Sequence, residues 1–218
     1  IKKKYITTPI YYVNDKPHIG HAYTTILADV LNRFYNLIGN DSFMLTGSDE
    51  HGQKVQQAAE KRGVEPIEHV NEYVQNFTDL WDSLNIQYND FIRTTEKRHT
   101  DRVKDMLKEL WERKEIYLDE YEGSYSVSEE RFITEKEIEE GNFKQIIKLK
   151  EKNYFFKMSK YQQQLIDHIN TNPNFIKPES RKNEVLGFLN KPLNDLCISR
   201  PKSRLNWGIE LPFDSEYV

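Results

Sequence analysis

The segment YITTPIYYVNDKPHIGH, residues 5–21, decides the fold class that this sequence predicts. Residues 5–8 are rich in β-branched and aromatic side chains, which predicts a first strand. Residues 9–17 begin and end with proline and carry polar turn-forming residues, which predicts a loop. From His18 to Gly39, apolar residues recur at intervals of three and four, which predicts a helix.

A short apolar run closed by a glycine, residues 43–47, follows this helix and predicts a buried strand. Residues 5–47 therefore predict strand, loop, helix and strand in that order, which is a βαβ unit and the start of a parallel sheet. Apolar periodicity predicts three further helices, over residues 49–61, 66–84 and 96–114. The predicted fold class is α/β.

The second half of the chain predicts a smaller, β-containing insertion. Residues 116–128 alternate and are rich in tyrosine, as in an antiparallel hairpin, and residues 153–157 predict an aromatic strand. Helices are predicted over residues 161–169 and 182–189, and an apolar strand over residues 196–199. The expected parts are the first half of an α/β domain at 1–115, the insertion at 116–172, and a return to the α/β sheet at 173–218.

Composition limits the functions that the chain can have. The 218 residues include one cysteine, Cys197, which excludes an intramolecular disulfide and any multi-cysteine zinc or iron–sulfur site. No apolar run approaches the ~20 residues of a membrane helix, so we expect no membrane partner. The N-terminal residues have no signal core, which predicts a cytoplasmic protein and leaves an organellar matrix open. A formal net charge of −4 gives no indication of nucleic-acid binding.

The start of the first predicted helix carries the strongest chemical signal, the sequence Pro17-His18-Ile19-Gly20-His21. Free backbone N–H groups and positive potential at a helix start suit a polyphosphate. His18 and His21 share one face of the first turn and can donate to phosphate oxygens, while Gly20 lets a nucleotide lie against the backbone. The alternative is a pair of surface histidines, but the preceding strand and loop favour a nucleotide site.

A second polar segment, residues 46–52, follows the second predicted strand. Ligands in open α/β sheets bind beyond the carboxyl ends of the strands, so Asp49 is placed to meet a cationic group of a ligand. Alternatively, Ser48 or Asp49 caps the following helix and needs no ligand. Position alone leaves both interpretations open.

These segments together resemble a known family. Residues 7–14 followed by Pro17–His21 are similar to the "HIGH" signature of class I aminoacyl-tRNA synthetases in its methionyl form, and residues 46–54 resemble the second methionyl block. Further matches occur, in order, at residues 91–96, 181–185, 198–201 and 206–209. HIGH alone fits several class I enzymes, but the set resembles methionyl-tRNA synthetases of the bacterial or organellar type. The resemblance implies a Rossmann-like, doubly wound parallel sheet, incomplete here, with a connective insertion.

The resemblance also implies a methionine site and a nucleotide site. Ile10 and Tyr12, with Pro9 beside them, match positions that line the methionine side-chain pocket, and an unbranched thioether suits such an apolar, aromatic pocket. Asp49 matches the carboxylate that holds the α-amino group of methionine.

The implied catalytic and ATP-binding residues come from both ends of the chain. His18, Gly20 and His21 match the ATP-binding signature, and both histidines are expected to act in catalysis. Arg200 matches a catalytic-site arginine that organises Asp49 and the ATP loop.

The activity that the resemblance implies is that of a methionine–tRNA ligase. Methionine and ATP, with Mg²⁺, give methionyl-adenylate, and the methionyl group then passes to the 3′ end of tRNA(Met). Two alternatives stay open: another class I synthetase or a nucleotidyltransferase with H-x-G-H, or a non-catalytic synthetase-like module that binds RNA or a partner. Intact His18, His21 and Asp49 favour an enzyme.

The tetrapeptide Lys157-Met158-Ser159-Lys160 resembles the family's "KMSKS" ATP loop, but it lies inside the insertion and is followed by Tyr161 rather than serine. We interpret it as the end of an aromatic strand, with Ser159 as the N-cap of a helix. The resemblance places the true lysine loop, the rest of the sheet and an anticodon-binding domain beyond Val218. We therefore expect this fragment alone to be inactive.

Many relatives carry a zinc knuckle in the insertion, and this sequence departs from it. Ser126 and Glu129 stand where a C-x-x-C pair would lie, and the downstream pair is absent around residues 142–145. Structural zinc needs four good ligands, usually thiolate or imidazole. We therefore predict no structural zinc and no other protein-bound metal.

Overall fold

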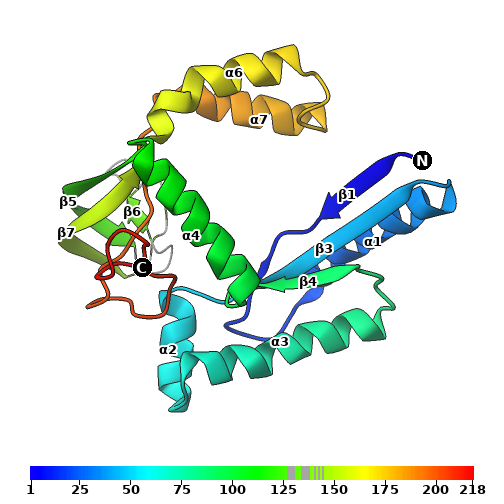
Figure 1. The fold of residues 1–218 in the computed structure, drawn as a ribbon, viewed down its shortest axis with the longest axis horizontal. Helices are drawn as coiled ribbons and strands as arrows, with labels where there is room; N and C mark the ends of the chain where they lie inside the picture. The colour runs from blue at the N-terminus through cyan, green and yellow to red at the C-terminus, as the bar shows by residue number, and fades with distance from the viewer. Residues whose placement is uncertain (127–130, 134–137, 140, 142, 144) are drawn as a thin grey trace. The chain divides into compact units, whose positions relative to one another are not determined.

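Two compact units, each with its own β-sheet, make up the chain in the computed structural model (Figure 1). The structure describes residues 1–126, 131–133, 138–139, 141, 143 and 145–218. The first unit comprises residues 1–106, 205–212 and 218, and the second comprises residues 107–204 and 213–217.

The first unit is built on a parallel sheet with β3 (Asp41–Asp49) at its centre. β1 (Lys3–Thr7), β2 (Tyr11–Tyr12) and β4 (Asp90–Arg93) all pair with β3 in parallel. The predicted βαβ unit is confirmed, but β2 lies in the expected loop. In the ladder, Ser48 pairs with Tyr11 of β2 and with Arg93 of β4. The carboxyl end of β3 is therefore held between β2 and β4.

The described residues of the first unit form four helices (Figure 1). They are α1 (Ile19–Leu37), α2 (Gln53–Arg62), α3 (Pro66–Ser83) and α4 (Lys97–Glu112), which continues into the second unit. α1 packs against β1 and β3, and α2 packs against α3. α2 begins later than the expected residue 49, because β3 continues in ladder pairing through Asp49. The core consists of Tyr11, Val13, Ala28, Met44, Val55, Val70, Val74, Phe77, Trp81 and Ile86.

α1 buries its polar side within the first unit. Asp29 Oδ1 accepts the Gln87 N–H at 2.9 Å, and Asn32 Nδ2 donates to the Gln87 carbonyl at 3.0 Å. The apolar stripe that predicted the helix is exposed instead, with Tyr23 66% and Leu37 85% accessible. Helical periodicity identified the helix, whereas the polar contacts to the chain before β4 determine which side faces the sheet.

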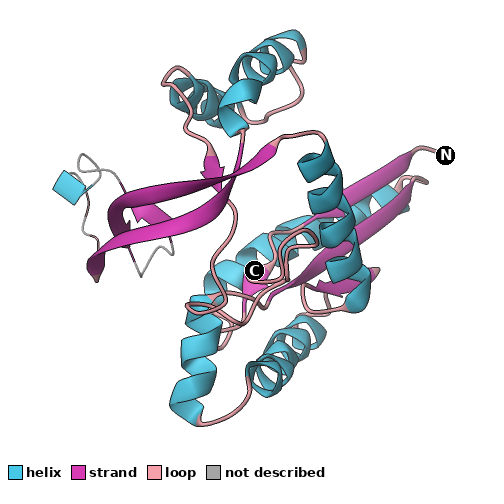
Figure 2. Ribbon diagram, turned by 60° about the vertical axis from the view of Figure 1, so that its left-hand side comes forward, coloured by secondary structure: helices cyan, strands magenta, loops and turns pink. Residues whose placement is uncertain are grey.

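The second unit is built on an antiparallel sheet in the order β6-β5-β7-β8. Figure 2 draws the strands of the chain in magenta. The strands are β5 (Ile116–Ser126), β6 (Arg131–Ile133), β7 (Ile146–Phe156) and β8 (Leu196–Cys197). We expected the strand at residues 196–199 to rejoin the parallel sheet, and this is wrong: Leu196 pairs with Phe156 and Cys197 with Phe155. The aromatic end of β7 has an edge available for pairing, and β8 is added there. The boundaries 1–115, 116–172 and 173–218 stay a prediction.

A helical pair completes the second unit. After the 3₁₀ turn η1 (Met158–Tyr161), α6 (Gln162–Thr171) and α7 (Glu179–Leu189) pack through Ile169, Leu189 and Leu193. Both predicted helices are present, but the predicted cap is wrong, because the Ser159 hydroxyl donates to Asp195 Oδ1 at 2.5 Å instead. Within the described part of the chain, the helices are too short or too polar to cross a membrane.

Candidate active site

His18 and His21 form the N-terminal cap of α1. The Gly20 N–H donates to His18 Nδ1 at 3.1 Å, and the His18 N–H donates to His21 Nδ1 at 3.1 Å, so each ring satisfies one backbone donor. The rings stack with their centroids 3.8 Å apart. Since a neutral imidazole that accepts at Nδ1 carries its proton on Nε2, the cap sets the tautomer of both rings. The Nε2–H of each histidine is then the donor that can serve a ligand.

The surroundings of His21 favour its neutral form. Its ring centroid lies 4.9 Å from that of Tyr11 and 5.3 Å from that of Phe77. Burial, and then the neighbouring His18, lower the pKa of His21 below its ordinary value. Tyr11, which the sequence did not single out, is buried, and its hydroxyl bonds Thr25 Oγ1 at 2.9 Å. Tyr11 therefore links β2 to the first turns of α1.

The structure gives a second reason for a glycine at position 20, beside the nucleotide approach that the sequence suggested. A Cβ at this position would lie 3.0 Å from Cε1 and 3.1 Å from Nδ1 of His18, which is tighter than ordinary side-chain packing. A side chain here would crowd the capping ring as well as the space where a nucleotide approaches the backbone.

Asp49 lies at the carboxyl end of β3, where it is the ladder partner of Tyr12 in β2. Directly paired residues of neighbouring strands share a face of the sheet, so two of the predicted methionine-site residues lie side by side. The alternative that Ser48 or Asp49 caps α2 is wrong, because the N-cap is Gly52, which has φ 109° and makes no side-chain cap bond. Pro9, Ile10 and Tyr12 are all exposed at this end of the sheet.

A buried carboxylate next to Asp49 was missed at the sequence level. Glu50 is fully buried and accepts hydrogen bonds from both Arg93 Nε at 2.6 Å and Arg93 Nη2 at 3.0 Å. Ser48 Oγ and Thr95 Oγ1 donate to the same carboxylate. A charged residue directly after a strand, with an arginine at the end of the next strand, is the only signal that the sequence offered.

Arg200 lies in the second unit, three residues after β8. Its Nη1 donates to the Ser199 carbonyl at 2.6 Å and lies 3.1 Å from Cys197 Sγ, and its guanidinium lies 5.5 Å from the ring centroid of Tyr125. The structure thus brings His18 with His21, and Tyr12 with Asp49, into the first unit, while Arg200 belongs to the other unit. The role of Arg200 stays a prediction.

The side chains of the KMSK tetrapeptide contact their own unit. Lys157 Nζ donates to the Lys114 carbonyl at 2.7 Å, Lys160 forms an ion pair with Glu115, and Ser159 bonds Asp195. The tetrapeptide forms the junction between the end of β7 and the 3₁₀ turn η1. These contacts account for the polar groups of the segment without a nucleotide.

We expect Lys157→Ala in the complete protein to change ATP affinity by less than about twofold, because its ammonium is used within the second unit. Loss of its one hydrogen bond should cost only about 1 kcal/mol of stability. Equilibrium ATP binding and thermal unfolding test this together. A tenfold or larger loss of ATP affinity with an unchanged melting temperature would show that Lys157 serves the nucleotide.

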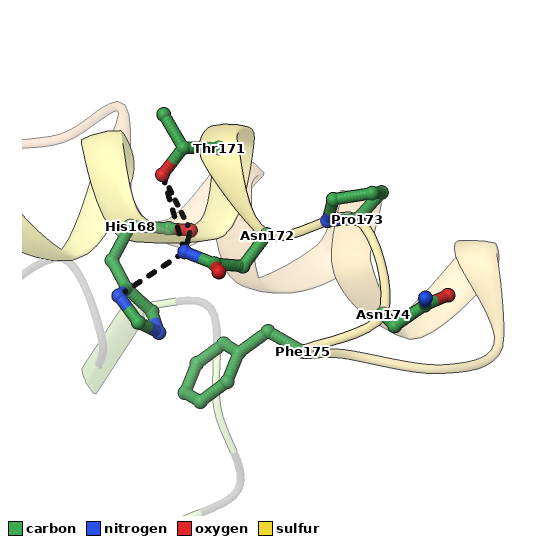
Figure 3. Close-up of a pocket in the computed structure, with 6 residues that line it drawn as sticks. All are labelled: His168, Thr171, Asn172, Pro173, Asn174 and Phe175. Carbon is green, nitrogen blue, oxygen red and sulfur yellow. Dashed lines mark hydrogen bonds between the residues drawn. The ribbon is translucent and has the colours of Figure 1, made fainter.

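A shallow pocket of about 280 Å³ lies at the end of α6 and is lined by His168, Thr171, Asn172, Pro173, Asn174 and Phe175 (Figure 3). Asn172 Nδ2 donates to the His168 carbonyl at 2.8 Å. The Phe175 ring packs edge-on against the His168 imidazole, with the two ring centroids 4.5 Å apart. These contacts close the C-terminus of α6, so the pocket is explained by helix capping.

In the part of the chain that the structure describes, no group of three or more His, Cys, Asp or Glu side chains is placed to hold a metal ion. Ser126, at one knuckle position, is at the end of β5. Glu129 and Asn142 lie outside the described residues, so the expected absence of zinc stays a prediction.

Comparison with known proteins places nearly the whole chain in one family. A family model described as tRNA synthetases class I (M) matches residues 4–145 and 141–218. The chain belongs to this class I tRNA synthetase family. The match covers both the capping histidines of α1 and the block around Asp49, so the class I synthetase resemblance of the sequence is confirmed.

Bacterial relatives of this class I synthetase chain carry the name methionine–tRNA ligase. The relative from Clostridium tetani is 49% identical over 222 residues, covering 100% of this chain and 34% of the relative. The relative from Listeria monocytogenes serovar 1/2a is 46% identical over 231 residues, covering 98% of this chain and 34% of the relative. The chain therefore spans about a third of the length of these curated relatives.

Solved structures support the same family. Methionyl-tRNA synthetase of Mycobacterium tuberculosis in complex with methionyl-adenylate matches with a TM-score of 0.93 and 39% identity, over 100% of this chain and 44% of that one. The apo form of the same enzyme matches with a TM-score of 0.80 and 36% identity, over 100% and 42%. The predicted fold class, an α/β synthetase catalytic domain, is confirmed.

Proposed function

We propose that the protein to which these residues belong is a methionine–tRNA ligase, acting on methionine, ATP and tRNA(Met). The observation that carries the proposal is the pair of histidines that cap the start of α1 through their Nδ1 atoms. In the same unit, Asp49 lies next to Tyr12 at the carboxyl end of the sheet. Ligands of open α/β sheets bind at this end of the strands. Family membership and the names of the relatives agree with this activity.

The methionine site is proposed at the end of β3. Asp49 would accept hydrogen bonds from the α-ammonium group, a charge-assisted contact. Tyr12, its ladder partner, and Ile10 would contact the thioether, with Pro9 beside them. The charge of Asp49 and the apolar surface of Tyr12 and Ile10 suit the two ends of the amino acid.

The ATP site is proposed at the start of α1, with Mg²⁺ accompanying the nucleotide as part of the substrate. A carboxylate oxygen of methionine attacks the α-phosphorus, and the bond from that phosphorus to the leaving pyrophosphate breaks. The Nε2–H groups of His18 and His21 would donate to phosphate oxygens as negative charge develops there, and Gly20 keeps the backbone accessible. Since these donors are fixed by the cap before the substrate arrives, little reorganisation is needed.

The transfer step needs no covalent intermediate on the protein. A hydroxyl of the terminal adenosine of tRNA(Met) attacks the carbonyl carbon of methionyl-adenylate, and AMP leaves. Arg200 is proposed to organise Asp49 and the ATP loop during these steps. We further propose a cytoplasmic location, with an organellar matrix as the alternative.

Methionine-dependent exchange of labelled pyrophosphate into ATP by the complete protein tests the proposed function. Exchange with methionine, but not with leucine, isoleucine or valine, is the expected result. Exchange that depends on another amino acid would point to a different class I synthetase. The absence of exchange and of tRNA charging would point to a binding module.

We propose that the insertion at residues 116–172 binds no zinc, because Ser126 and Glu129 stand where a zinc knuckle would have cysteine thiolates. We therefore expect elemental analysis of the complete protein, purified without chelators, to give far less than one zinc per chain. Chelator treatment should leave both the melting temperature and pyrophosphate exchange unchanged. Stoichiometric zinc that survives dialysis would contradict the prediction.

A further inference from the structure

The buried Glu50 and its partner Arg93 lie directly beside the proposed amine-binding residue. We propose that the Glu50–Arg93 pair is a positioning device that holds Asp49 in place to bind the α-ammonium group of the amino acid. This inference rests on the proposed function. It adds two positioning residues to the site, neither of which touches the substrate.

The Glu50 carboxylate accepts four hydrogen bonds, two at each oxygen. Oε1 accepts from Ser48 Oγ at 2.5 Å and from Arg93 Nε at 2.6 Å, and Oε2 accepts from Arg93 Nη2 at 3.0 Å and from Thr95 Oγ1. Arg93 Nη2 also donates to Asn71 Oδ1 at 2.7 Å. The two-pronged Arg–carboxylate contact fixes direction as well as distance.

The backbone of Glu50 is held as firmly as its side chain. Its N–H donates to Thr94 Oγ1 at 2.9 Å, and its carbonyl accepts the indole N–H of Trp207. On the other side of Asp49, the Ser48 carbonyl accepts the Thr94 N–H at 3.3 Å. Asp49 is therefore placed between two residues whose main chains are both tied to the segment after β4.

Strand alternation separates the anchor from the site. Side chains of consecutive strand residues point to opposite faces, so Ser48 and Asp49, the last two residues of β3, face opposite sides. Glu50 follows the strand, and its carboxylate lies on the Ser48 side, because it accepts from Ser48 Oγ at 2.5 Å. Gly47 allows β4 to come close, since a Cβ there would lie 2.1 Å from the Ile92 carbonyl oxygen. Glu50, which is buried, and Arg93, which is partly exposed, thus fix the strand end from the face opposite to the one that Asp49 occupies.

Stability alone does not account for an ion pair in this position. A buried ion pair is often no more stabilising than an apolar group of the same size, because both charges lose water. What such a pair does supply is geometric precision, and binding groups need support that holds them within about 0.5 Å of the productive position. Because the pair is next to Asp49 in the chain, it can hold the Asp49 carboxylate in the position that binds the α-ammonium group.

The test uses the complete protein and two unreactive ligands that differ only in the amine: methioninol and its desamino counterpart, 4-(methylsulfanyl)butan-1-ol. Glu50→Gln keeps the shape but removes the charge opposite Arg93. We expect it to weaken methioninol binding about tenfold and to change binding of the desamino alcohol by less than about twofold. In an Asp49→Ala background, Glu50→Gln should have no further effect on methioninol, since the two residues act through one contact.

Asp29→Asn is the matched control, because Asp29 is a second buried carboxylate of the first unit, bonded to Arg33 and to the Gln87 N–H. It should lower the melting temperature without distinguishing the two alcohols. If Glu50→Gln does not fold, Thr95→Val removes one donor and leaves the ion pair, and about threefold weaker methioninol binding is expected.

Equal weakening of both alcohols by Glu50→Gln, no effect on either, or an effect that persists unchanged in the Asp49→Ala background would overturn the positioning role. Failure of the proposed function is a separate outcome. In that case the unaltered protein shows no methionine-dependent exchange, and Asp49→Ala does not weaken methioninol binding.

Discussion

Replacing His21 with alanine in the complete protein should lower the rate of methionyl-adenylate formation by about 10²- to 10³-fold, the usual cost of losing one pre-positioned donor to a developing charge. The reason lies in the cap, because His21 accepts the His18 N–H through Nδ1 and so keeps Nε2–H for the phosphates. Methionine affinity should change by less than about threefold, because the ring serves the transition state. Single-turnover kinetics at saturating ATP and equilibrium methionine binding measure the two effects.

Two further variants separate the donor from the cap. In His21→Asn the side-chain oxygen takes the place of Nδ1, so the cap is kept and the Nε2 donor is lost, and we expect a rate loss close to that of His21→Ala. His168→Ala, which changes a histidine at the end of α6, should leave the rate unaltered. A rate near that of the unaltered protein for His21→Asn, or equal losses of rate and methionine affinity for His21→Ala, would remove His21 from the phosphate site.

Replacing Asp49 with alanine should weaken methionine binding by about 100-fold, which corresponds to the lower part of the range for removing one partner of a charge-assisted pair. ATP binding should change by less than about threefold, because the nucleotide is placed at the start of α1. Equilibrium binding of each ligand to the complete protein gives both numbers. The difference between the two ligands is the signature of an amine-binding carboxylate.

Asp41→Asn is the control for this prediction, because Asp41 begins the same strand that Asp49 ends. It removes a carboxylate from β3 at the opposite end of the sheet and should leave both affinities unchanged. Asp49→Asn should behave like Asp49→Ala, since it lacks the charge. Methionine binding that survives both Asp49 variants would exclude this residue from the amino-acid site.

The HIGH segment shows how far local sequence determines a site. A capping box needs only residues three apart, so the pattern His18-x-x-His21 already contains both partners of each hydrogen bond. The same holds for the helices, whose apolar periodicity predicted α1, α3, α4, α6 and α7 close to their observed bounds. Asp49 could be placed at a strand end for the same reason, although the choice between ligand and cap required the structure.

The sequence by itself therefore determined the α/β class, the family and the position of the two histidines at a helix start, because these depend on residues within one turn, one strand or one motif. That the two rings cap the helix through Nδ1 was seen only in the structure. Only the tertiary structure decided the rest. Glu50 and Arg93 are 43 residues apart and meet because β4 pairs with β3 in one particular register. The polar side of α1 is buried, and β8 joins the antiparallel sheet, for the same kind of reason. Each depends on which distant segment supplies a matching hydrogen-bonding edge, and no local pattern encodes that choice.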